Sequence, residues 1–137
     1  MISTVEIYKS QHKIILSLCD ALIRSAELCI LEKETSHFES IQHTLDEILT
    51  LHLNSEDEYF YPCLAKEGDK EVRRIAQQFQ IEMAETTDVY MAYKSRYNKA
   101  EYILKESDLF VKNTVDLVQA LKTRIEKEEK ELYSLLP

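Results

Sequence analysis

Two pairs of residues, each four positions apart, have side chains that could do chemistry. His52 is followed by Glu56, and Arg124 is followed by Glu128. A spacing of four places both members of a pair on one face of a helix, one turn apart. Imidazole nitrogens and carboxylate oxygens bind iron, manganese and zinc in proteins, so the first pair predicts a metal site.

The two pairs belong to a longer internal repeat. Residues 52–62 align with residues 124–134: an imidazole or basic side chain, a glutamate four positions later, a second acidic residue, and then an apolar residue followed by tyrosine. In a bundle whose helices alternate in direction, the second and fourth helices are parallel. We therefore expect the two copies to face each other at the same depth.

Four helices are predicted to position these residues. Apolar side chains recur at intervals of three and four over about residues 3–31, 36–64, 70–98 and 107–132, with a looser connection at 99–106. Pro62 is expected to end or kink the second helix. The short connections predict an all-α fold, an up-down-up-down antiparallel four-helix bundle, in one domain over residues 1–137.

The apolar stripes of all four helices contain polar side chains. His12 lies in the stripe of the first helix, Glu82 in that of the third, and Arg124 in that of the fourth. A buried carboxylate is costly unless it is paired or binds a metal, so these residues predict a shared site in the core. The candidate metal ligands are His12, His52, Glu56, Glu82 and Glu128.

Composition excludes several other classes. One glycine and two prolines in 137 residues are too few for a β-rich fold or a glycine-rich phosphate loop. The net charge of −8 opposes binding to nucleic acid or to an anionic membrane. Three cysteines without a C-x-x-C motif, and an N-terminus without a signal peptide pattern, predict a cytoplasmic protein.

The arrangement resembles the hemerythrin-like HHE cation-binding domain family over essentially the whole chain. Residues 52–62 match H-x-x-x-E-[DE]-x-x-[FL]-[FY]-P at every defined position. The resemblance implies a four-helix bundle with a non-haem di-iron centre. It also implies that His12 is the first-helix ligand, that His52 and Glu56 are the His-x-x-x-Glu pair with a bridging glutamate, and that Glu128 is the fourth-helix carboxylate.

The chain departs from the family pattern in two places. The third helix has no histidine, and Arg124 stands where the fourth helix would offer one; arginine stays protonated and cannot ligate a cation. His37 and His43 are predicted to face away from the core. Three alternatives remain: a carboxylate-rich two-metal centre, one metal held by two histidines and a carboxylate, or a metal-free core in which Arg124 replaces the cation.

The favoured function is binding of non-haem iron, di-iron or mononuclear, for binding or sensing of dioxygen, nitric oxide, redox state or iron. No general acid or base stands apart from the ligand set, so enzymatic turnover is not favoured. The alternative function is a metal-free interaction or regulatory domain. The sequence predicts no specific protein partner.

Overall fold

The computed structural model describes residues 3–137, and within this range the chain is helical and contains no strand. Met1 and Ile2, which the sequence assigns to the same domain, lie outside the described residues. Among residues 3–137, no helix combines the length and apolar character needed to cross a lipid bilayer. The elements are α1 Thr4–Glu32, α2 Ser36–Ser55, η1 Glu56–Phe60, α3 Tyr61–Glu67, α4 Lys70–Arg96, α5 Ala100–Lys105, α6 Ser107–Lys127, η2 Glu128–Leu132 and η3 Tyr133–Leu135.

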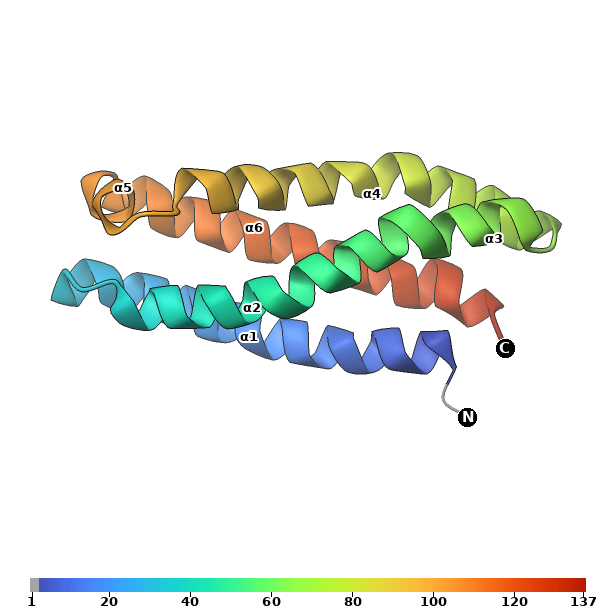
Figure 1. Cartoon of the computed structure of the whole chain (residues 1–137), viewed down its shortest axis with the longest axis horizontal. Coiled ribbons are helices and arrows are strands. Elements are labelled where there is room, and N and C mark those ends of the chain that lie inside the picture. The colour runs from blue at the N-terminus through green and yellow to red at the C-terminus, as the bar shows by residue number, and fades with distance from the viewer. Residues whose placement is uncertain (1–2) are drawn as a thin grey trace.

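The long helices lie lengthwise beside one another (Figure 1). Helix α1 contacts α2 and α6, and α4 contacts α3 and α6. Helix α3 extends the line of α2, and the short α5 lies at the end of the molecule away from both termini (Figure 1). The connection at residues 99–106 is therefore not the loose segment that the sequence suggests, because α5 forms there and fully buries Ile103.

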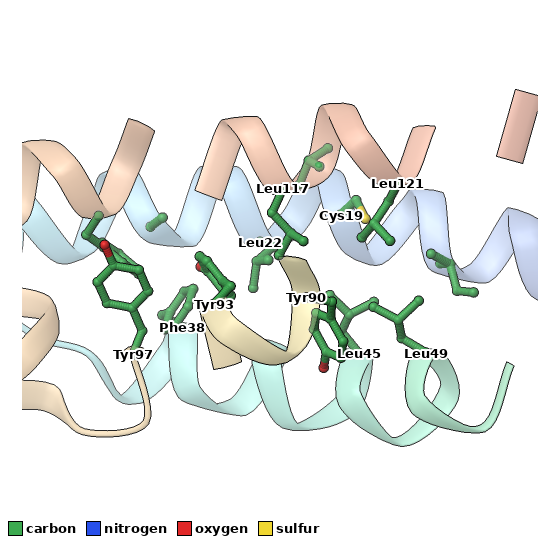
Figure 2. Close-up of a cluster of buried hydrophobic side chains, with 14 of the residues drawn as sticks. Cys19, Leu22, Phe38, Leu45, Leu49, Tyr90, Tyr93, Tyr97, Leu117 and Leu121 are labelled. Atoms are coloured by element: carbon green, nitrogen blue, oxygen red, sulfur yellow. The ribbon is translucent and has the colours of Figure 1, made fainter. Parts of the chain in front are cut away.

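Two apolar clusters fill the interior, and they lie on either side of the buried polar residues. The larger cluster, part of which Figure 2 shows, contains Leu22 of α1, Leu45 of α2 and Leu121 of α6. The smaller cluster contains Tyr8, Tyr61, Ile75, Phe79, Met83, Leu132 and Tyr133. Along α1, the buried His12 stands between Tyr8 of the smaller cluster and Ile15 of the larger one.

Each copy of the internal repeat contains a π-helical segment that begins at its glutamate. In η1 the Tyr61 N–H donates to the Glu56 carbonyl, and in η2 the Tyr133 N–H donates to the Glu128 carbonyl. Such i→i+5 bonds accommodate one more residue per turn than an α-helix does. As a result, each glutamate and the tyrosine five residues later are buried together.

The helix does not end at Pro62. The π-helical segment η1 precedes this proline, and α3 continues to Glu67. Pro62 is the second residue of α3 and directly follows the π-helical turn, so the N–H that proline lacks falls where the α-helical hydrogen-bond pattern is already interrupted. The second predicted helix therefore extends three residues beyond its expected end at Leu64.

The structure predicts that Leu45 and Leu51, both on α2, differ sharply in their contribution to stability. Leu45 is completely buried and Leu51 is 64% exposed. Leu45→Ala leaves a cavity in the larger cluster and should lower the free energy of unfolding by about 2–5 kcal/mol, measured by urea denaturation. Leu51→Ala is the control and should change it by no more than about 0.5 kcal/mol. Equal effects would contradict the assigned helix orientation.

Candidate metal centre

Four predicted ligand residues converge at one point in the core. His12, His52, Glu56 and Glu128 each offer a ligand atom, and these atoms all lie within 4.8 Å of one another. All four residues are at most 2% exposed. They come from α1, α2, η1 and η2, so four separate elements supply the cluster.

The outer nitrogens of the two imidazoles face hydrogen-bond acceptors. His12 Nδ1 lies 2.7 Å from a carboxylate oxygen of Glu129, and His52 Nδ1 lies 2.6 Å from the side-chain oxygen Oε1 of Gln11. Because both partners accept hydrogen bonds, the proton of each neutral imidazole belongs on Nδ1. Each Nε2 therefore presents a lone pair to the centre, as in metal-binding histidines.

The Nε2 atoms of the two imidazoles and one oxygen of Glu56 lie close together at the centre of the cluster. His12 Nε2 and His52 Nε2 are 3.1 Å apart, and His52 Nε2 is 2.8 Å from Glu56 Oε1. Glu56 Oε1 is buried and has no hydrogen-bond partner. In a metal site with bonds of about 2.1 Å, neighbouring donor atoms are roughly 3 Å apart. The donors present therefore fit a metal ion, which would also coordinate the Glu56 oxygen that has no hydrogen-bond partner.

Burial favours the neutral form of the two histidines, so they contribute no positive charge to the site. The pKa of His52 is lowered to about 4, and burial is the largest cause. Burial also lowers the pKa of His12. Both rings are therefore neutral near pH 7. Burial and the neighbouring Glu56 raise the pKa of Glu128 well above its ordinary value. A cation in the centre would favour the ionised form of this carboxylate.

Arg124 supplies the one buried guanidinium beside the cluster in the described residues. It is 2% exposed and donates to Glu128 Oε1 at 3.2 Å and to Asp57 Oδ1 at 2.8 Å. It also donates to the Met83 carbonyl at 2.9 Å and to Thr87 Oγ1 at 3.0 Å. The guanidinium thus fills the side of the site that faces α4.

Tyr133 lies between the two carboxylates, and the sequence does not predict it as a site residue. Its hydroxyl oxygen lies 2.6 Å from Glu56 Oε2 and 2.9 Å from Glu128 Oε2, and its one hydrogen is donated to one of these two oxygens at a time. The signal available in the sequence is the tyrosine that follows the glutamate by five positions in both copies of the repeat. At α-helical spacing this position does not share a face with the glutamate; the π-helical segment brings it there.

Glu82 does not join the cluster, contrary to the expectation from the third helix. Its side chain is 36% exposed and pairs with Lys127 at 2.7 Å rather than with Arg124. The buried residue at this level of α4 is Met83, four residues after the buried Phe79. The predicted stripe steps three residues from Phe79 and so selects the wrong neighbour.

The structure predicts that Arg124 is required for stability in the absence of metal. Arg124→Met leaves Glu56, Glu128 and Asp57 without their cation and should cost about 3–5 kcal/mol in free energy of unfolding, measured by urea denaturation with chelator present.

The matched control for this substitution is Lys122→Met on the same helix. The Lys122 side chain is 38% exposed and pairs with Asp20 at 3.4 Å. Its loss should change the free energy of unfolding by no more than about 1 kcal/mol. An Arg124→Met effect as small as this would show that the carboxylates do not depend on the guanidinium.

Comparison with known proteins assigns the chain to a family. A family model described as the hemerythrin HHE cation binding domain matches residues 3–136. No curated protein and no solved structure matches the chain significantly. The matched range covers nearly the whole sequence and includes all four converging residues. The chain therefore belongs to the hemerythrin HHE cation-binding domain family.

Proposed function

We propose that the chain binds one non-haem iron ion through His12, His52, Glu56 and Glu128. The observation that carries the proposal is the convergence of two imidazole Nε2 lone pairs and the unpartnered Glu56 Oε1 on one buried point. Lone pairs that face one another without a donor repel, and a metal ion turns this repulsion into coordination.

The charge of the site favours one ion over two. Glu56, Glu128 and Asp57 contact the single guanidinium of Arg124 and leave a formal charge of −2 when a bound cation keeps all three ionised and the histidines are neutral. Glu129 is not counted, because it is 39% exposed and lies on the outer side of His12. One divalent cation cancels this charge. A second cation would lie against Arg124, because the guanidinium already fills the side of the site next to Thr87 and Met83.

The donor set supports iron. Two imidazoles and a carboxylate are the ligands of non-haem Fe(II) sites, and the second carboxylate adds a further hard oxygen donor. Bound iron would supply redox chemistry and a coordination position for dioxygen or nitric oxide. The role of the chain's own residues is to hold this site: Glu129 and Gln11 orient the imidazoles, and Arg124 fixes Glu128.

Binding or sensing of dioxygen, nitric oxide, redox state or iron is the function that this site supports best. In this proposal Glu56 and Glu128, the two carboxylates nearest the centre, serve as ligands and not as a general acid or base. The proposal also includes the up-down-up-down bundle as the arrangement of the long helices, a single domain, and the cytoplasmic location that the cysteine pattern predicts.

The alternative function is a metal-free interaction or regulatory domain in which Arg124 replaces the cation. The contacts of Arg124 with Glu128, Asp57, Thr87 and Met83 favour it. However, Arg124 Nη2 comes no closer than 3.5 Å to Glu56 Oε1, and that oxygen has no hydrogen-bond partner. The guanidinium therefore takes the place of one cation and leaves the histidine side of the site unsatisfied.

Iron content tests the proposal directly. Protein stripped with chelator, loaded anaerobically with ferrous iron and desalted should hold one iron per chain by mass spectrometry of the metal. His52→Ala removes a ligand and should weaken binding by more than about 100-fold, since even the loss of a partner that orients a ligand costs 10–100-fold.

The control is His43→Ala, because the side chain of His43 is 77% exposed and pairs only with Glu47. This variant should bind iron like the wild type. Full occupancy in His52→Ala would exclude the cluster as the site, and two irons per chain would contradict the assigned role of Arg124.

Thermal stability separates the two functions. Metal that binds only the folded chain should stabilise it by about 2.7 kcal/mol at a free iron concentration 100 times the Kd, and excess chelator should reverse the rise in melting temperature. The metal-free alternative predicts the same melting temperature with iron and with chelator.

A further inference from the structure

We propose that Tyr133 is a direct ligand of the ferric ion, through its phenolate oxygen. The inference rests on the proposed iron site and adds a fifth protein ligand to it. The observation that carries it is the position of the Tyr133 hydroxyl between the two carboxylates of the cluster.

The phenolic oxygen stands at the spacing of a neighbouring ligand. It lies 2.9 Å from Glu128 Oε2 and 2.6 Å from Glu56 Oε2. Donor atoms that share an ion at bond lengths of about 2.1 Å are roughly 3 Å apart when adjacent. The Tyr133 oxygen therefore lies at the spacing of an adjacent ligand from one oxygen of each carboxylate that is proposed to bind the ion.

The ring of Tyr133 is held in the direction that this ligation needs. It stacks on the His12 ring with centroids 5.6 Å apart and planes 9° from parallel. Phe60 packs edge-on against the Tyr133 ring at 6.0 Å, and the tyrosine is 2% exposed. The stacking holds the ring in place, while its hydroxyl contacts Glu56 and Glu128 and His12 Nε2 contacts His52.

Charge makes the ferric ion the partner of the phenolate. The three carboxylates and Arg124 leave a charge of −2, which a ferrous ion cancels while Tyr133 remains a neutral phenol. A phenolate makes the charge −3, which a ferric ion cancels. On ligation the O–H bond breaks, the oxygen–iron bond forms and the proton is released to water, with no change in oxidation state.

The repeat provides a matched control, because only one of its two tyrosines bridges the carboxylates. Tyr61 follows Glu56 by five residues just as Tyr133 follows Glu128, and both tyrosines are buried. The Tyr61 hydroxyl instead lies 3.5 Å from Arg124 Nη2. Tyr133 is therefore the tyrosine of the repeat whose hydroxyl contacts both Glu56 and Glu128.

The test is the visible spectrum of the iron-loaded full chain after oxidation to the ferric state with ferricyanide. A phenolate bound to ferric iron gives a charge-transfer band in the visible, and resonance Raman excitation in that band enhances phenolate ring modes. We expect both signals in the wild type, their loss in Tyr133→Phe with iron still bound, and their retention in Tyr61→Phe.

The possible results each decide the proposal. If the wild type holds one iron but shows no phenolate modes, or if Tyr133→Phe keeps them, Tyr133 is not a ligand and the proposed iron site stands. If the wild type holds no iron, the iron site and this inference both fail. If Tyr133→Phe cannot hold iron, modes that persist in both Tyr61→Phe and Tyr8→Phe assign the signal to Tyr133, and their loss in either variant overturns the assignment.

Discussion

The interior of this protein is organised around two carboxyl groups that the fold buries away from solvent. Glu56 and Glu128 are completely buried, and the only guanidinium that reaches them among the described residues is that of Arg124. Ionised carboxylates in such surroundings require compensating cations or hydrogen-bond donors. This requirement explains the roles of the surrounding side chains. Tyr133 donates a hydrogen bond to one carboxylate or the other, and Asp57 and Thr87 accept hydrogen bonds from the guanidinium and hold it in place. The two neutral histidines offer lone pairs to a cation.

The two copies of the repeat meet the requirement by different means. In the second copy the negative charge of Glu128 is balanced by the guanidinium of Arg124, which lies one turn earlier on the same helix. The first copy has a neutral imidazole at the same position, and His52 brings a lone pair to Glu56 instead of a charge. The site is therefore built from unequal halves, with the guanidinium of Arg124 on one side and two neutral imidazoles on the other.

The sequence predicts most of the cluster because its members obey ordinary helical spacing. His52 and Glu56 are four residues apart, and the same interval separates Arg124 from Glu128. His12 follows from the apolar stripe of the first helix, and it is buried as predicted. Glu82 is wrongly predicted to face the core because the apolar positions of a helix recur at steps of either three or four residues. A step of three from Phe79 selects Glu82, whereas the buried residue is Met83, four positions on. Tyr133 is missed for a different reason: its approach depends on a π-helical turn, and local sequence preferences do not distinguish that turn from the α-helix around it.

The π-helical segments η1 and η2 also constrain how the chain can change in length. An α-helix advances each residue by roughly 100° around its axis, so the loss of one residue from a regular stretch such as the middle of α1 would rotate everything beyond it by that angle. Each π-helical turn already holds one residue more than an α-helical turn. The loss of one residue there would restore α-helical spacing and place the tyrosine four positions after its glutamate, which is still the same face. The two glutamate-led turns are therefore the places inside the helices where the chain could be shortened by one residue without rotating the segments that follow.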